Sequence, residues 1–319
     1  MRHPLDLPPE LRSIHFSTAD AADRGVGPWR LRARTVEHPF YGVNVLAGQH
    51  DSSSRDLDQV RRACDAYLVR MLPGQWFSHT TGAALVGIPL PPQMRADSVH
   101  VSVRAPRTPP RAAGVMGHRI SADVRVGTTG SKYPSCSPVD IWCQLSTVIG
   151  PSDLVAAGDF LVGSRNRAPI LDIVALADAC ARYGSKRGAV HRATALERIR
   201  FGADSPPETL LRLRLVEAGL PEPVVQPPVI VAGRMVLHPD LLLPDDRVTF
   251  EYEGDGHRVD PEQWQRDIDR EELFKRAGYQ VVRVTSKHLF GSRREFEDRL
   301  RRLGLLPAKG ARSGVRPFD

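Results

Sequence analysis

The chain has 319 residues and a mass of 35.2 kDa, with 41% hydrophobic and 25% charged residues, a composition typical of a globular protein of two or three domains. Its formal net charge is +7 and its pI is about 9.5, which fits a nucleic-acid partner without establishing one. The N-terminus lacks the apolar core of a signal peptide, and no apolar run approaches the ~20 residues needed to span a bilayer, so we expect a cytoplasmic protein without membrane contact.

Arginine makes up most of the basic residues, because only five of the 44 are lysine. Two causes explain this excess of arginine: a GC-rich genome favours arginine codons, and contact with phosphate favours the planar guanidinium. The sequence does not decide between them. The four cysteines are widely spread and form no CxxC pair, so they indicate neither a zinc site nor a disulfide framework.

Residues 1–55 have the outline of a winged-helix module. Ser17 or Thr18 caps a short helix, a glycine-containing turn follows, and residues 29–34 and 39–43 form a second helix and a strand. The segment resembles the N-terminal module of AbiEi-type antitoxins and related regulators. A small helical cap packed on the next domain explains the same pattern. In the winged-helix interpretation, three arginines of the second helix contact DNA: Arg30, Arg32 and Arg34.

Residues 56–165 are expected to form an α/β scaffold domain. A helix over residues 57–72, a strand over residues 99–103 and a capped helix that opens at Ser137 outline it. His79 has no acid or cysteine nearby in the sequence, so we predict a structural role for it. The stretch resembles the middle region of AbiEi-like proteins, where it is a scaffold and interaction domain.

Residues 166–204 are predicted to form a basic helical bridge. Arg187 and Arg192 lie among glycine and serine residues in the densest basic patch outside the tail, and this pattern suits phosphate contact. A solvated helix face explains the patch as well. The tail, residues 307–319, is rich in glycine, proline and arginine and is predicted to be disordered.

Residues 205–306 have the order helix, strands, helix, strand, which predicts a mixed sheet flanked by helices. Ser205 is the expected N-cap of the first helix, with Glu208 at its positive end. A hairpin then pairs the strand that follows Asp240 with a strand that ends in residues 251–253. The segments expected next are a helix and a strand, residues 261–277 and 279–285.

Acidic residues gather at one end of this hairpin. Asp240 and Glu251 lie on neighbouring strands, and alternation of side chains puts Glu251 and Glu253 on one face. Carboxylates placed in this way repel one another unless a cation lies between them, and we expect Mg²⁺ or Mn²⁺ held by Asp240 and Glu251. His257 has an ordinary pKa near neutrality and is suited to proton transfer. The alternative is a solvated strand end with a surface histidine.

The segment resembles the PD-(D/E)xK nuclease superfamily, and specifically the branch related to the very-short-patch repair (Vsr) endonucleases, found as a domain in actinobacterial proteins. The residues that carry this resemblance are Glu208, Pro239, Asp240, residues 251–255, His257, Arg266, Asp267, Arg270 and residues 278–285. The resemblance covers the last third of the chain. It implies a metal-binding aspartate at Asp240, a second acid at Glu251, completion of the acidic cluster by Glu208, and acid–base work by His257.

One position departs from the superfamily pattern. Glu253 stands where a lysine is expected two residues after the acid, so another cation must stabilise the developing charge. Arg266, Arg270 and Lys275 are the candidates nearby in the sequence. The Vsr branch also lacks the lysine and uses histidine.

The sequence therefore predicts an α/β (α+β) protein with a winged-helix-like N-terminus, an α/β scaffold and a restriction-endonuclease-like C-terminal domain. The predicted function is metal-dependent DNA cleavage in repair or mobile-element defence. The alternatives are a non-catalytic, antitoxin-like DNA-binding regulator with a degenerate nuclease fold and a protein-interaction scaffold. The residues assigned to catalysis are Glu208, Asp240, Glu251, Glu253 and His257. Those assigned to nucleic acid are Arg30, Arg32, Arg34, Arg187, Arg192, Arg266 and Arg270.

Overall fold

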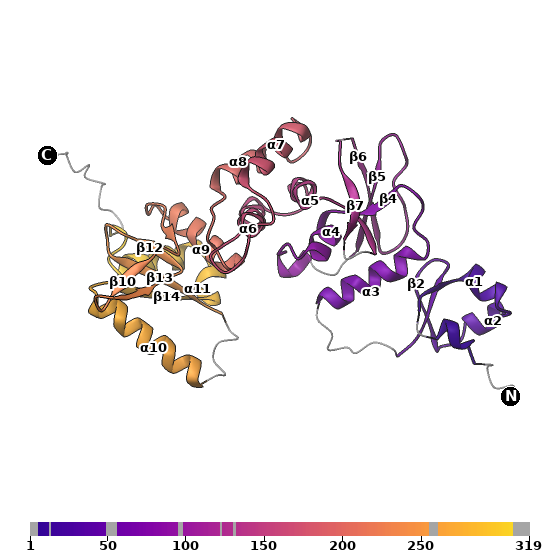
Figure 1. Cartoon of the computed structure of the whole chain (residues 1–319), viewed down its shortest axis with the longest axis horizontal. Coiled ribbons are helices and arrows are strands. Elements are labelled where there is room, and N and C mark those ends of the chain that lie inside the picture. The colour runs from indigo at the N-terminus through magenta and orange to yellow at the C-terminus, as the bar shows by residue number, and fades with distance from the viewer. Residues whose placement is uncertain are drawn as a thin grey trace. The chain divides into compact units, whose positions relative to one another are not determined.

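A computed structural model of the chain describes residues 6–12, 14–48, 56–94, 98–121, 123–129, 132–254 and 261–308 (Figure 1). Two compact units make up the chain: Met1–Ala157 with Leu171–Glu197, and Gly158–Ile170 with Arg198–Asp319. Helices and mixed sheets occur in both units, so the predicted mixed class is confirmed. The division of the chain into the five segments expected from the sequence stays a prediction. Residues 309–319 of the tail lie outside the described residues.

A membrane-spanning segment was not expected from the sequence. Among the described residues, no helix is long and apolar enough to cross a membrane.

The first unit begins with a three-stranded sheet in the order β1-β3-β2, preceded by a short 3-10 turn. These elements are η1 (Pro9–Leu11), β1 (Phe16–Ser17), α1 (Thr18–Asp23), α2 (Pro28–Leu31), β2 (Val36–Phe40) and β3 (Val43–Leu46). The predicted cap of α1 is confirmed, because the Ser17 hydroxyl accepts the Asp20 amide at 2.9 Å. The second helix is a single turn, so the prediction of a helix over residues 29–34 was too long. Tight turns between Arg30 and Val36 take the chain into β2 instead.

A five-stranded mixed sheet in the order β6-β5-β4-β8-β7 forms the centre of the first unit (Figure 1). Its strands are β4 (Gln75–Phe77), β5 (Val99–Arg104), β6 (Val115–Ile120), β7 (Val126–Thr129) and β8 (Tyr133–Cys136). The other elements of this region are α3 (Asp56–Leu68), α4 (His79–Val86), η2 (Pro92–Met94), α5 (Pro138–Leu145), α7 (Ile173–Tyr183) and α8 (Ala189–Arg198). Val99 and Val101 of β5 pack with Tyr67 of α3 in one buried cluster. The predicted cap of α5 is confirmed, because the Ser137 hydroxyl accepts the Asp140 amide at 3.3 Å.

The second unit is built on a four-stranded sheet in the order β14-β13-β12-β9, with a separate hairpin of β10 and β11. Helix α6 (Pro151–Val162) leads the chain into this unit. The elements that follow are α9 (Pro206–Glu217), β9 (Val224–Val225), β10 (Val229–Val231), β11 (Met235–Leu237), β12 (Leu241–Leu243), β13 (Val248–Glu253), α10 (Pro261–Arg276), β14 (Gln280–Thr285), α11 (Ser286–Phe290) and α12 (Arg293–Arg302). The predicted order and the antiparallel hairpin of β12 and β13 are confirmed, and β13 runs parallel to β14.

Two hydrophobic layers cover the two faces of this sheet. On one face, Phe250 of β13 packs with Leu211 of α9 and with residues of α11 and α12. On the other face, Leu242 of β12 packs with Phe274 of α10 and with the β10–β11 hairpin. Because side chains alternate along a strand, Glu251 lies on the face that α10 covers.

A buried ion pair joins the end of α6 to α9 within the second unit. The side chains of Arg212 and Asp159 are each 1% exposed, and Nη2 lies 3.1 Å from Oδ2. The Thr209 hydroxyl donates to the same carboxylate oxygen at 2.8 Å, and the Arg200 amide donates to the other at 2.7 Å. Glu222 also contacts the Arg212 guanidinium, at 2.6 Å. The pair positions the helix that carries Glu208.

We expect Asp159→Ala to lower the free energy of unfolding of the second unit by about 3 kcal/mol. This is the lower end of the range for breaking a buried pair, because Glu222 still neutralises part of the arginine charge. Urea unfolding followed by circular dichroism measures the change. Glu272→Ala, which removes an exposed ion pair with Arg276 in the same unit, is the control and should cost at most about 1 kcal/mol. Equal losses in the two variants would contradict the structural role of Asp159.

Candidate active site

Asp240 and Glu251 lie side by side at one end of the β12–β13 hairpin. Leu241 is paired with Phe250, so the next pair outward in the antiparallel register is Asp240 and Glu251. Asp240 Oδ2 accepts the Tyr252 amide at 2.7 Å, which holds the carboxylate against β13. The prediction that the two acids lie on neighbouring strands is confirmed.

Glu208 joins the two strand acids from the first turn of α9. It is 7% exposed, and its two oxygens accept the Asp204 amide at 3.0 Å and the Ser205 hydroxyl at 2.7 Å. Ser205 therefore donates to Glu208 and makes no side-chain cap of its own. Gln226 links the helix to the strands, because its side-chain amide donates to Glu208 at 3.3 Å and its backbone amide donates to the Asp240 carbonyl at 3.0 Å.

The three carboxyl groups have raised pKa values. Burial raises the pKa of Glu208 to about 7, and the charge of Asp240 adds to the rise. Burial also raises the pKa of Asp240 to about 7, with repulsion from Glu251 next in importance. Burial raises the pKa of Glu251 to about 7 although the nearby Arg270 opposes the shift. The cluster as a whole thus titrates near neutrality, with its protons shared among coupled groups.

Arg270 of α10 is the cation that contacts this cluster. Its guanidinium donates to Glu251 Oε1 at 3.4 Å and also to the backbone carbonyl of His238. Of the other candidate cations, Lys275 is paired with Glu271 at 2.5 Å, and Arg266 is exposed one turn away from Arg270. The structure therefore brings one of the three predicted cations to the acids. His257 lies outside the described residues.

Glu253, which stands in the expected lysine position, is held in a separate ion-pair network. Its carboxylate pairs with Arg283 of the neighbouring strand β14, and Arg283 Nε also donates to Glu271 at 2.6 Å. Arg283 was not predicted as a site residue. A charged side chain inside the β-branched run of β14 was the sequence signal that could have indicated it. Gln226 had no comparable signal, because its role depends on the pairing of β9 with β12.

The spacing of the acids limits what they can hold. In the described part of the chain, three histidines are the only group of three or more His, Cys, Asp or Glu residues whose ligand atoms all lie within 4.8 Å of one another. Glu208, Asp240 and Glu251 are therefore spread more widely than that. No described residue donates a hydrogen bond to Asp240 Oδ1 or Glu251 Oε2. Carboxylate oxygens are the ligands that a hard divalent cation prefers, so these two atoms are the candidate ligands.

Two of the arginines predicted to contact DNA have structural roles. Arg192 is 1% exposed, and its guanidinium donates to the carbonyls of Gly184 at 2.9 Å and Arg187 at 3.0 Å, which closes the turn between α7 and α8. Arg30 is buried and donates to the Thr35 hydroxyl at 3.1 Å. Both side chains are buried, so neither is placed where it could contact a phosphate. The exposed members of the predicted set are Arg32, Arg34, Arg187 and Arg266.

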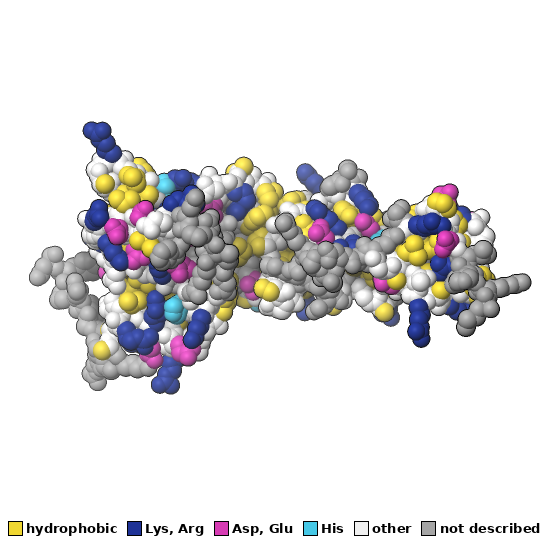
Figure 2. Space-filling model, turned by 90° about the horizontal axis from the view of Figure 1, so that it is seen from below, with side chains coloured by type: hydrophobic (Ala, Val, Ile, Leu, Met, Phe, Trp, Pro, Cys, Tyr) yellow, Lys and Arg dark blue, Asp and Glu magenta, His cyan; other side chains and the backbone are white. Residues whose placement is uncertain are grey.

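The charge on the face drawn in Figure 2 does not single out a nucleic-acid surface. On the face drawn in Figure 2, lysine and arginine side chains lie interspersed with aspartate, glutamate and apolar side chains. The single-turn α2 is also too short to lie along a major groove as a recognition helix does. DNA contact by the N-terminal segment therefore stays a prediction.

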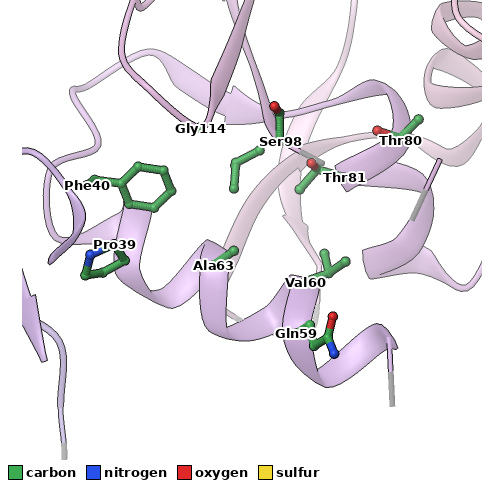
Figure 3. A pocket seen from close by; sticks show the side chains of 10 residues that line it. Pro39, Phe40, Gln59, Val60, Ala63, Thr80, Thr81, Ser98 and Gly114 are labelled. Carbon is green, nitrogen blue, oxygen red and sulfur yellow. The ribbon is translucent and has the colours of Figure 1, made fainter. Parts of the chain in front are cut away.

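A cavity of about 240 Å³ lies in the first unit, lined by residues of β2, α3, α4 and β5 (Figure 3). Its described lining contains hydroxyl and amide side chains, such as Thr80, Thr81 and Gln59, and no acid, base or thiol. The cavity can accommodate a small molecule, yet none of its described lining residues is an acid or base that could activate one of the hydroxyl groups. The acidic cluster of the second unit is therefore the stronger candidate for a reaction.

No known family model matches the chain, and no curated protein or solved structure matches it. The resemblance of residues 205–306 to the PD-(D/E)xK superfamily accordingly stays a prediction.

We expect the raised carboxyl pKa values to make the second unit less stable as the pH rises from about 4 to about 7. Between the unfolded pKa of about 4 and the folded pKa of about 7, the folded state binds more protons than the unfolded state, so deprotonation favours unfolding. Asp240→Asn should reduce this fall by at least about 1 kcal/mol, the equivalent of one pKa unit. Urea midpoints measured at several pH values test it.

The matched control is Glu272→Gln, which neutralises an exposed carboxylate in the same unit. It should keep the wild-type pH dependence. An Asp240→Asn variant with the wild-type pH dependence would show that Asp240 is not strained by burial and repulsion.

Proposed function

We propose that the second unit is a Mg²⁺-dependent DNA endonuclease of the Vsr-like type, acting in DNA repair or in defence against mobile elements. The observation that carries the proposal is the gathering of Glu208, Asp240 and Glu251 at one end of a mixed sheet, each with a pKa raised to about 7. Such a cluster is unfavourable in its charged form unless a cation neutralises it. DNA as the partner and a cytoplasmic location belong to the same proposal.

Each residue of the cluster has a role in this proposal. Asp240 and Glu251 would hold the ion. When bound, the ion would neutralise charge on the scissile phosphate and lower the pKa of a bound water. The Tyr252 amide and the Arg270 guanidinium fix the orientation of these two carboxylates. Arg270 also supplies positive charge where the superfamily lysine is missing. Glu208 is protonated more readily than an ordinary glutamate and can exchange a proton near pH 7.

A non-catalytic DNA-binding regulator with a degenerate nuclease fold is the second candidate. Glu253 stands in the lysine position and is paired with Arg283, so this position adds no positive charge beside the acids. Among the described residues, Arg270 is the only cation in ion-pair contact with Glu251, and it neutralises one of the two proposed metal ligands. These two ion pairs are the observations that support the second candidate.

We expect Mg²⁺ or Mn²⁺ to stabilise the wild-type protein by relieving repulsion between Asp240 and Glu251. At an ion concentration ten times Kd, the stabilisation is about 1.4 kcal/mol by mass action. Because ion binding displaces protons from carboxyls with a pKa of about 7, the stabilisation should be larger at pH 8 than at pH 6. Thermal unfolding with and without the ion measures it. The same response in wild type and Asp240→Asn would show that Asp240 holds no ion.

Asp246→Asn is the matched control for the Mg²⁺ experiment. Asp246 lies exposed in the turn of the same hairpin, between β12 and β13. Its loss changes the charge of the hairpin by the same amount without touching the acidic cluster, so its ion response should equal that of the wild type.

We expect the wild-type protein to nick supercoiled plasmid DNA in the presence of Mg²⁺ or Mn²⁺. Asp240→Asn should abolish nicking, whereas Asp246→Asn should retain it. DNA binding measured by gel shift should survive in both variants, because a single carboxylate is not the main electrostatic anchor. Gel electrophoresis of the plasmid over time measures the reaction. Binding without cleavage of any DNA or RNA substrate by clean wild-type protein would establish the regulator instead.

A further inference from the structure

Three histidines converge in the first unit, away from the acidic cluster. His79 begins α4, His100 lies in β5 and His118 lies in β6. One ring nitrogen from each lies within 4.8 Å of the other two. His118 Nε2 is 3.0 Å from His100 Nδ1, and the rings of His79 and His118 stack with centroids 3.6 Å apart. Residues separated by up to 39 positions in the chain are thus brought to one point by the sheet.

The sheet explains why His100 and His118 meet. β5 and β6 are parallel, with Ser102 of β5 opposite His118, so His100, Ser102 and His118 lie on one face. Val99, on the opposite face of β5, lines the cavity of Figure 3. The histidine cluster and that cavity are therefore separate features.

His79 is held in place by contacts that resemble the supporting shell of a metal ligand. Its Nδ1 is 3.0 Å from the Ser78 hydroxyl, which in turn accepts the Ser102 hydroxyl at 2.7 Å. Its backbone amide donates to Gln144 Oε1 at 3.1 Å. The contact at Nδ1 leaves Nε2 as the ring atom available to an ion. The backbone of His79 has a φ of 48°, and left-handed conformations of non-glycine residues concentrate at functional sites.

The cluster is electrostatically suited to an added cation. Burial lowers the pKa of His100 to about 4, and repulsion from His118 adds to the effect. Burial, followed by repulsion from Arg187, lowers the pKa of His118 to about 4, and burial also lowers that of His79. All three imidazoles are therefore neutral at pH 7, which is the form that binds metals.

We propose that His79, His100 and His118 form a binding site for a single borderline transition-metal ion, with Zn²⁺ as the best fit. Neutral imidazole suits Zn²⁺, Ni²⁺ and Cu²⁺ and does not suit Mg²⁺, which prefers oxygen ligands. Zn–N bonds of about 2.0–2.1 Å in a tetrahedron place two ligand nitrogens about 3.3 Å apart. To admit the ion, the His100 and His118 nitrogens, at 3.0 Å, need to separate by a few tenths of an ångström, and the stacked rings of His79 and His118 need to rotate so that their nitrogens face one point. Three protein ligands leave a fourth position for water or a ligand.

The test uses the full-length chain, purified without a histidine tag and freed of metal with a chelator. We expect isothermal titration with Zn²⁺ to give one tight site per chain, and the Co²⁺-loaded protein to show the visible absorption of a low-coordinate Co²⁺ ion. His118→Gln should weaken Zn²⁺ binding by at least about 10–100-fold, the loss that changes in the surrounding shell already cause. His118 is the least buried of the three, so its replacement is the least disruptive to folding.

Two controls locate the site. His38→Gln removes an exposed histidine of the same unit and should leave Zn²⁺ affinity unchanged, as should Asp240→Asn in the acidic cluster. Ser78→Ala should lower Zn²⁺ affinity about 10–100-fold while leaving the three imidazoles in place. If His118→Gln does not fold, the Zn²⁺ affinity of His100→Gln and the number of Zn²⁺ ions bound per wild-type chain test the proposal instead. A wild-type chain that takes up no Zn²⁺, or a folded His118→Gln protein that binds it as tightly as wild type, overturns the proposal.

Discussion

The register of β12 against β13 is the constraint on which the candidate active site depends. With Leu241 opposite Phe250, the apolar residues of both strands enter the two buried layers, and Asp240 lies beside Glu251. A slip of one residue would move every side chain of a strand to the opposite face, so that charged groups would enter the core. The hydrophobic layers therefore fix the position of the two carboxylates, although neither acid contributes to the core itself.

Two neighbouring groups of charges at the acidic end of the β12–β13 hairpin are balanced differently. Glu253, Arg283 and Glu271 form a network in which the guanidinium is shared by two carboxylates. Glu208, Asp240 and Glu251 have Arg270 as the neighbouring cation, and burial leaves their pKa values near 7. The first group is a stabilised structural network. The second group has a deficit of positive charge, which is why it is the place where an ion or a proton can be taken up.

The richness in arginine has a structural component that composition does not reveal. Arg192 and Arg212 are each 1% exposed, and each joins segments of its own unit through several hydrogen bonds. Arginine is suited to this task because its guanidinium carries five donors in a fixed plane and remains charged. An excess of basic residues is therefore a poor guide to phosphate contact until the buried arginines have been set aside.

The pattern of apolar residues, caps and turns was sufficient to predict several local elements of this protein. The helix α9, the hairpin of β12 and β13, the helix α10 and the strand β14 follow from short-range periodicity, and so does the neighbourhood of Asp240 and Glu251 across one turn. The short helices α11 and α12 and the single turn of α2 were missed or misjudged, because element ends depend on packing and on competing turns.

Contacts between distant segments were decided by tertiary structure alone. The link from Gln226 to Glu208, the pairing of Glu253 with Arg283 and the meeting of His79, His100 and His118 depend on which strands become neighbours in a sheet. Strand order is set by burial summed over a whole unit, and no local stretch of residues carries that information. The sequence by itself determined several of the helices and strands and the types of chemical group available. The tertiary structure decided which groups meet and which arginines are buried.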